Sequence, residues 1–206
     1  MKLIIIFAGC LCCFIACKKP KIKAVNTNDS RDSLTYQPKV PGSRWTYTRS
    51  VLGQNTTYNF VRLTYDTISN GATFPVFQND IDANQYIRQD GDKYYSVLTA
   101  STQKPTLLVL DAAKNVNESW IGGVNGSDTY TYTMKEKIPI YFLDGFTFKN
   151  VLKVYTERTT GSPNNITLAG DTYYAQGIGQ VKTDGFVKSN GITVNVLVKL
   201  ISVDLK

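Results

Sequence analysis

The sequence predicts an all-β domain with mainly antiparallel strands, and three observations support this prediction. Runs rich in Tyr, Phe, Val, Thr and Ile, which favour extended strands, follow one another from Gly42 to the end of the chain. Asn-Gly and Asp-Gly dipeptides, which adopt the tight turns of β-hairpins, separate many of these runs. Only residues 110–119 have the pattern of a helix. We therefore expect a curved meander sheet, arranged as a half-barrel, a barrel or a two-layer sandwich, with at most one short helix.

The expected strands follow one another in order along the chain. The first begins where the apolar Trp45 and Tyr47 alternate with polar residues. The others are expected over residues 56–68, 73–78, 85–89, 93–99, 106–110, 129–139, 146–159, 172–176, 179–183 and 192–204. Residues 151–152 and 194–200 are apolar on both faces, so we expect some segment to cover the back of the sheet there.

Six dipeptides that tolerate the positive φ of two-residue turns mark the expected hairpins. They are Asn70-Gly71, Asp90-Gly91, Asn125-Gly126, Asp144-Gly145, Asp184-Gly185 and Asn190-Gly191. Most lie between two strand-like runs, which predicts sequential antiparallel pairing. In residues 110–119, Asp111 is a candidate N-cap of a short helix. Alternatively, the segment is an irregular loop that carries Trp120 into the core.

The first sixteen residues have the pattern of a secretory signal peptide. Lys2 supplies a positive charge, and residues 3–16 are apolar or small but too short to span a membrane as a mature helix. The small Ala16 before Cys17 resembles the lipobox of bacterial lipoproteins, although Phe14 stands where leucine is usual. This resemblance implies cleavage between Ala16 and Cys17 and acylation of the cysteine thiol. The alternative is an ordinary cleaved signal without lipid.

Cys17 is preferred over the three earlier cysteines because the apolar run ends there and a polar segment begins. Residues 17–40 are polar, contain prolines and lack apolar periodicity, so we expect a flexible tether. The lysines at its start would lie beside the membrane and contact anionic head groups. Residues 41–206 are long enough for one domain with its own core.

The composition excludes several kinds of chemistry. The chain contains no histidine, which removes the usual general base, the usual partner of a catalytic serine and the commonest metal ligand. All four cysteines lie at or before Cys17, so the domain has neither a disulfide nor a thiol nucleophile. We expect no metal site, no cofactor and no catalytic residue. The formal net charge is +7, but basic residues are spread along the strands, so nucleic acid is not an expected partner.

Short motifs across the domain resemble those of a known group of proteins. They are the Gly-Ser-Arg-Trp-Thr-Tyr opening at residues 42–47, residues 148–154, and the Tyr-Tyr-Ala-Gln-Gly-Ile-Gly-Gln-Val-Lys closing motif at residues 173–182. They are similar to uncharacterised Bacteroidota outer-membrane lipoproteins and, more distantly, to the half-barrels of periplasmic lipoprotein carriers. The resemblance implies an antiparallel β domain anchored to the outer membrane by its lipid. In such bacteria acidic residues after the cysteine are associated with surface export, so the lysine-rich residues 18–21 favour the periplasm-facing leaflet.

The closing motif predicts a structural turn, because Gly177 and Gly179 permit a bend that directs Ile178 inward. A glycine pair of this kind without a following helix does not predict a nucleotide site. Asp32-Ser33-Leu34, in the expected tether, resembles the O-glycosylation sequence of the same bacteria.

Aromatic side chains are the candidates for ligand binding. Trp45, Trp120, Tyr173 and Tyr174 have rings that stack on sugars or line an apolar cavity, although core and cross-strand packing is the alternative for each. Residues 80–84 begin like a calcium loop. The glycine and glutamate that an EF-hand requires are absent from the positions that follow, so an EF-hand is excluded.

Three functions are compatible with the sequence. The first is a non-catalytic envelope protein that binds or carries an apolar or glycan-like ligand, which predicts an aromatic-lined cavity. The second is an accessory subunit of an envelope protein complex, which predicts an exposed apolar patch. The third is a hydrolase that uses carboxylates alone, which predicts two acids with raised pKa values facing each other in a cleft.

Overall fold

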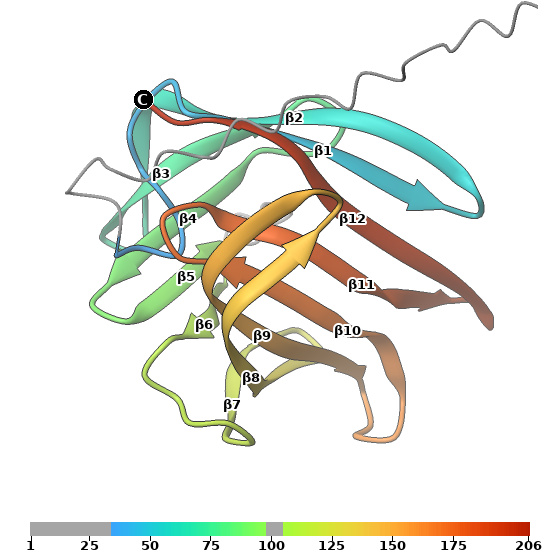
Figure 1. The fold of residues 1–206 in the computed structure, drawn as a ribbon. Helices are drawn as coiled ribbons and strands as arrows, with labels where there is room; N and C mark the ends of the chain where they lie inside the picture. Colours follow the sequence, from blue (N-terminus) through green and yellow to red (C-terminus); the bar gives the residue numbers. More distant parts are fainter. Residues whose placement is uncertain (1–33, 98–104) are drawn as a thin grey trace, which may run out of the picture.

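The computed structural model describes residues 34–97 and 105–206. These residues form one sheet of twelve strands, all paired antiparallel (Figure 1). The strands are β1 (Arg44–Val51), β2 (Gln54–Ser69), β3 (Ala72–Asn79), β4 (Gln85–Asp90), β5 (Lys93–Val97), β6 (Thr106–Asp111), β7 (Ser119–Asn125), β8 (Asp128–Leu143), β9 (Phe146–Thr160), β10 (Ile166–Ala175), β11 (Gly179–Ser189) and β12 (Ile192–Asp204). The all-β prediction is confirmed. Within the two described ranges, no helix has the length and apolar character needed to cross a membrane.

The sheet curves into a nearly closed barrel. Its strand order is β6-β5-β4-β3-β2-β1-β12-β11-β10-β9-β8-β7, so consecutive strands are neighbours and the first strand pairs with the last. The two edge strands of the sheet are β6 and β7, which follow each other near the middle of the sequence. Of the arrangements that the sequence allowed, the structure shows the barrel rather than the two-layer sandwich (Figure 1).

The barrel has two ends, which we name for the description of the site. The tether end is where β1 begins and β12 ends, and it includes the turn that joins β10 to β11. The hairpin end carries the turns that join β1 to β2 and β11 to β12, on the right of Figure 1, and the connection from β9 to β10, at its lower right.

Five of the six expected turn dipeptides lie at strand connections. The first residues of three of them, Asn70, Asp144 and Asn190, have positive φ angles of 51°, 45° and 51°, the backbone that a type I′ hairpin turn requires. One such turn carries no sequence signal, because Leu52, with a φ of 50°, takes the place of the usual Asn or Asp before Gly53. Its side chain is exposed at the hairpin end.

The sixth dipeptide, Asp184-Gly185, is not a turn, and this prediction was wrong. Both residues lie inside β11, which continues to Ser189. Gly185 pairs with Gly170 of β10. A Cβ atom on Gly170 would lie 2.5 Å from the Cα of Gly185, so the two backbones approach more closely than any side chain permits. The glycine serves close strand packing here instead of a turn.

Residues 112–118 form turns between β6 and β7 and no helix. The Asp111 carboxylate accepts a hydrogen bond from the backbone N–H of Ala113 at 3.2 Å, as a cap would, but no helical turn follows. The second expectation, a loop that leads Trp120 into the core, is the one observed.

Trp120 closes the seam between β6 and β7. Its Nε1 donates a hydrogen bond to the Leu108 carbonyl oxygen at 2.9 Å, and its ring stacks on Tyr132 with centroids 5.6 Å apart. Gly122 lets β7 approach the other edge, because a Cβ atom there would lie 2.8 Å from the same carbonyl oxygen. A side chain therefore joins the two edges where the backbone ladder is interrupted.

The part of the β8–β9 hairpin that is nearest to its turn, residues 140–149, bends over the outside of the barrel (Figure 1). Asn150 has a φ of 49° within β9, opposite Pro139, which has no N–H to donate to the ladder. Beyond this bend, Tyr141 stacks on Tyr173 of β10 with ring centroids 5.0 Å apart. The fully buried Val151 also belongs to the core cluster here, so this hairpin covers one segment that the sequence shows to be apolar on both faces.

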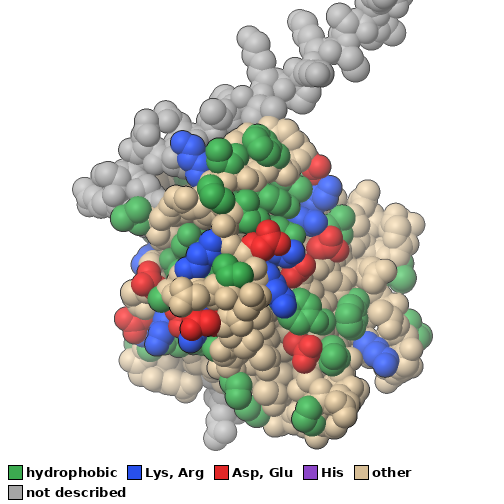
Figure 2. All heavy atoms as spheres, turned by 60° about the horizontal axis from the view of Figure 1, so that its bottom comes forward, with side chains coloured by type: hydrophobic (Ala, Val, Ile, Leu, Met, Phe, Trp, Pro, Cys, Tyr) green, Lys and Arg blue, Asp and Glu red, His purple; other side chains and the backbone are tan. Residues whose placement is uncertain are grey.

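The surface carries both signs of charge in close proximity. On the face seen in Figure 2, Lys and Arg side chains lie beside Asp and Glu side chains, with apolar side chains between them. Lys153 contacts Glu136 at 3.2 Å and Asp171 at 3.4 Å, and Lys182 contacts Asp184 at 3.0 Å.

Candidate functional site

A cavity of about 140 Å³ lies inside the barrel. Its lining comes from strands β1 to β6, β10 and β11 and from two residues that precede β1. The lining residues are Tyr36, Gln37, Tyr47, Tyr58, Phe60, Asn79, Gln85, Ile87, Tyr94, Ser96, Val109, Leu110, Tyr174 and Gln180. Five are tyrosines and five carry an amide or aliphatic hydroxyl group, and no charged side chain belongs to this set. The cavity is therefore aromatic and polar but neutral.

The tyrosines are held in place by stacking and hydrogen bonds. Tyr47 and Tyr58 stack with ring centroids 5.4 Å apart, and the Tyr47 hydroxyl donates to the Gln180 carbonyl oxygen at 2.9 Å. The Tyr94 hydroxyl accepts the backbone N–H of Tyr36 at 2.8 Å. These contacts hold the rings in fixed positions around the cavity.

Residues 34–38 close the tether end of the cavity. Thr35, Gln37 and Pro38 are buried, and the Gly177 N–H donates to the Thr35 carbonyl oxygen at 2.7 Å. Residues 34–40 were expected to belong to the flexible tether. The structure shows that this part of the segment packs against the barrel, while residues 17–33 lie outside the described ranges.

The closing motif, residues 173–182, contacts residues 34–38 through its turn. Gly177 and Gly179, with φ angles of 75° and 100°, form the turn between β10 and β11, and Ile178 between them is buried in the core. A Cβ atom on Gly179 would lie 3.2 Å from the side-chain oxygen of Gln37, so a larger residue would displace this amide from the cavity wall. The turn therefore lies behind Gln37 and holds this residue at the cavity wall.

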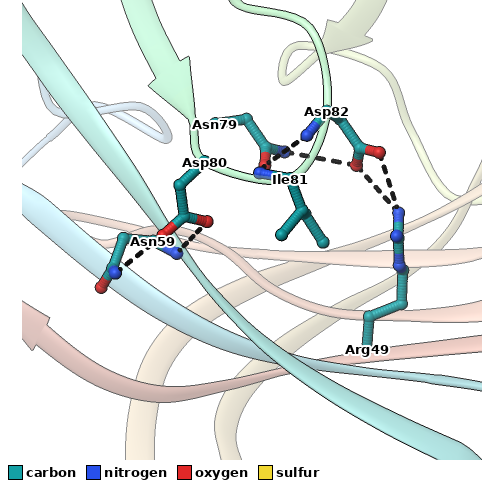
Figure 3. A network of polar contacts seen from close by, with 6 residues as sticks. All are labelled: Arg49, Asn59, Asn79, Asp80, Ile81 and Asp82. Carbon is teal, nitrogen blue, oxygen red and sulfur yellow. Dashed lines mark hydrogen bonds and ion pairs between the residues drawn. The ribbon is translucent and has the colours of Figure 1, made fainter.

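The loop between β3 and β4 is flanked by the cavity residues Asn79 and Gln85, and its two acids lie near Tyr58. Figure 3 shows the polar contacts of this loop. Two of its acids are engaged by neighbouring strands. The Arg49 guanidinium donates to Asp82 at 2.8 Å, and the backbone and side-chain amides of Asn59 donate to Asp80, each at 2.9 Å. The Asn79 side-chain oxygen accepts the N–H groups of the next residues and shapes the turn.

The carboxylate oxygens of Asp80 and Asp82, in the segment that begins like a calcium loop, thus accept hydrogen bonds from other protein groups. Within residues 34–97 and 105–206, no group of three or more acids gathers as metal ligands would.

Burial raises the pKa of three cavity tyrosines, Tyr47, Tyr58 and Tyr174. It raises the pKa of Tyr174 to about 12. Burial also raises the pKa of Tyr58 to about 12, although the Arg49 charge opposes the shift while Asp82 and Asp80 add to it. The pKa of Tyr47 is raised well above its usual value by burial and by the neighbouring phenols of Tyr58 and Tyr174. All three present neutral hydroxyl groups at physiological pH.

The stability of the protein is expected to fall as the pH rises from about 10 to about 12. The unfolded chain releases phenolic protons near pH 10, whereas Tyr58 and Tyr174 keep theirs until about 12 in the folded state. Their contribution to folding is therefore complete below pH 10 and is lost as the pH approaches 12. Urea unfolding at a series of pH values measures this loss. The double variant Tyr58→Phe, Tyr174→Phe should show a shallower decline, and an equally steep one would contradict the assignment.

The four aromatic candidates have different places in the structure. Tyr174 lines the cavity. Trp45 is buried in the core and donates its Nε1 hydrogen to the Ile178 carbonyl oxygen at 2.6 Å, and Trp120 closes the seam. Tyr173 stacks on Tyr141, with the ammonium groups of Lys153 and Lys182 within 6 Å of its ring centroid.

Sequence reasoning did not single out Tyr47, Tyr58 or Gln85 as part of a site. For Tyr47 a signal existed, because it alternates in phase with the buried Trp45. Ala16 and Cys17 lie outside the described residues, as do Asp32 and Ser33 of the expected glycosylation sequence.

The chain matches no known protein family, and no curated protein matches it. Two solved structures are similar to it. One is a "putative lipoprotein" of Parabacteroides distasonis, with 11% identity and a TM-score of 0.46 over 84% of this chain and 100% of that chain. The other is a "putative exported protein with YmcC-like fold" of Bacteroides fragilis, with 12% identity and a TM-score of 0.46 over 82% of this chain and 98% of that chain. Neither similarity assigns this chain to a family.

Proposed function

We propose that this protein is a non-catalytic envelope protein, held by acyl chains on Cys17 at the periplasmic face of the outer membrane, and that its barrel binds a small neutral ligand. The anchor and location rest on the signal peptide pattern and on the Ala16-Cys17 motif. The binding role rests on the cavity inside the barrel. The ligand would offer apolar or sugar-like ring faces and a few uncharged polar groups.

The observation that supports the binding function most directly is the chemistry of the cavity lining. Aromatic rings supply apolar contact area, while amides and protonated phenols supply hydrogen bonds in fixed directions. A charged ligand would meet no opposite charge in this lining and would lose its hydration without compensation. A carboxylate pair for hydrolysis would have to lie in the lining, which contains neither Asp nor Glu. Binding without catalysis therefore fits this cavity best.

A second candidate function is supported by the tip of the β8–β9 hairpin. Ile140 and Phe142 are 55% and 73% exposed there. The two side chains share one face of β8, and contiguous exposed apolar surface is a mark of protein–protein interaction sites. An accessory role in an envelope complex predicts cross-links from this tip to a partner in intact cells, which the variant Phe142→Ser would weaken.

Native mass spectrometry of the protein purified from its envelope tests the binding function. We expect an added mass that leaves on denaturation. The variant Tyr174→Phe should retain it about tenfold less well, because one buried hydroxyl loses its ligand hydrogen bond. Tyr173→Phe changes the neighbouring residue, which stacks on Tyr141 instead of lining the cavity, and should leave retention unchanged. A bare polypeptide, or equal losses in both variants, would argue against the cavity as a binding site.

The same spectra test the anchor. The covalent mass should correspond to a chain that begins at Cys17 and carries acyl groups, and Cys17→Ser should abolish both the acyl mass and the membrane association. A chain that begins elsewhere without added acyl groups would instead support an ordinary cleaved signal.

A further inference from the structure

A second hollow, of about 250 Å³, lies on the sheet formed by β9 to β12. Most of its lining residues are aliphatic, small or threonine. They are Thr156, Leu168, Ala169, Gly170, Thr172, Thr183, Gly185, Phe186, Val187 and Val196. The hollow therefore differs in chemistry from the tyrosine-rich cavity.

Strand register places this hollow on the inner face of the barrel. Alternate residues of a strand share a face, so Thr172 and Gly170 lie on the same side of β10 as Tyr174, which lines the cavity. Their partners on β11, Thr183 and Gly185, share that face with them. The hollow thus continues the inner surface from Tyr174 toward the hairpin end.

Two glycines give the hollow its depth. Gly170 and Gly185 are cross-strand partners, and neither places a side chain over the sheet between them. The register continues from Gly185 to Val196, while Leu168 pairs with Val187. A bare stretch of backbone is thus flanked by aliphatic side chains, the surroundings that suit a hydrocarbon chain.

We propose that the ligand of this protein is a neutral amphiphile, with its uncharged polar head in the tyrosine-lined cavity and its hydrocarbon chain in the hollow of β9 to β12. This inference rests on the proposed binding function and names the class of ligand. The two linings together contain no charged side chain, which excludes complementarity to an ionic head group. The change from phenols and amides to aliphatic groups along one inner face matches the two halves of such a molecule. Each methylene buried in the hollow would strengthen binding about fourfold.

Photo-crosslinking with the full chain in its own membranes tests the inference. Two alkyl glucosides serve as probes, one with a diazirine at the end of the alkyl chain and one with a diazirine on the sugar. The chain-end probe should label peptides from β10, β11 and β12, and the sugar probe should label the peptides that carry Tyr58 and Gln85. Peptide mass spectrometry locates both labels.

Variants of two adjacent residues provide a matched comparison. Val196→Phe fills the hollow and should lower chain-end labelling at least fivefold while sugar labelling at the cavity persists. Leu197→Phe changes the next residue on β12, which points to the opposite face, and should leave both labels unchanged. If Val196→Phe fails to fold, Leu168→Gln makes the same test by placing an amide in the hollow.

The outcomes separate this inference from the binding function beneath it. Chain-end labelling that avoids β10 to β12, or that responds equally to Val196→Phe and Leu197→Phe, overturns the amphiphile while sugar labelling in the cavity still supports binding. If neither probe labels the barrel interior, the amphiphile is overturned, and a bare polypeptide in the native mass spectra would then overturn the binding function as well.

Discussion

Replacing Gly170 by alanine is expected to lower the free energy of unfolding by about 3 kcal/mol, the upper range for overpacking a tight site. The added Cβ atom would lie 2.5 Å from the Cα of Gly185 and 2.6 Å from the Asp184 carbonyl oxygen. Both neighbours are backbone atoms within paired strands, so no side-chain rotation relieves the clash. Urea unfolding followed by circular dichroism measures the loss.

The matched control is Gly191→Asn in the turn between β11 and β12. Gly191 has a φ of 79°, which asparagine tolerates better than most residues, and a Cβ atom there would meet no atom of the described residues within 4 Å. We expect a loss of less than about 1 kcal/mol for this variant. Equal losses in the two variants would show that close packing of β10 and β11 is not the cause.

Replacing Arg62 by methionine is expected to cost about 3 kcal/mol or more, as breaking a buried charged network does. The side chain is only 6% exposed. Its Nε donates to the Lys39 carbonyl oxygen at 3.2 Å, and its Nη1 donates to the carbonyl oxygens of Leu63 and Tyr65. Its Nη2 pairs with Asp66. Methionine fills similar space but leaves these acceptors without their donor.

Arg88→Met provides the comparison. The Arg62 guanidinium lies 5.9 Å from the ring centroid of Phe77. Arg88 likewise places its guanidinium over aromatic rings, 5.6 Å from the centroid of Phe74 and 4.8 Å from that of Tyr95. However, its buried Nε has no hydrogen-bond partner among the residues that the structure describes, so methionine removes an unsatisfied group. We expect a loss below about 1 kcal/mol. If Arg88→Met lowers the free energy of unfolding as much as Arg62→Met does, contacts with aromatic rings and not the buried hydrogen bonds would explain the loss.

Local sequence signals predicted most strands and most turns because these depend on neighbours in the chain, but they did not predict β7. Asn70 and Asn190 take the backbone that their side chains and the following glycines favour. Asp184-Gly185 has the same local signal but a different role, because Gly170 lies opposite it in the folded sheet. That partner is distant in sequence, and no property of the dipeptide reveals it.

The candidate site was harder to predict because it depends on which face of each strand turns inward. The neighbouring Tyr173 and Tyr174 point to opposite faces, and only the closure of the barrel decides that Tyr174 lines the cavity. The short polar segment around Thr35 resembles a linker in sequence. Its buried position depends on the Gly177 N–H and the Tyr94 hydroxyl, which only the folded sheet brings to it.

The pairing of β1 with β12 has a consequence for the order in which the protein folds. Hairpins between consecutive strands involve short loops and form quickly, but the pairing of Arg44 with Asp204 joins opposite ends of the domain. A chain that emerges with its N-terminus first, from a ribosome or through a membrane, leaves one edge of β1 without its partner until β12 has emerged. Nearly the whole chain must therefore be present before the barrel can form. The appearance of the last strand, β12, sets the earliest time at which folding can be completed.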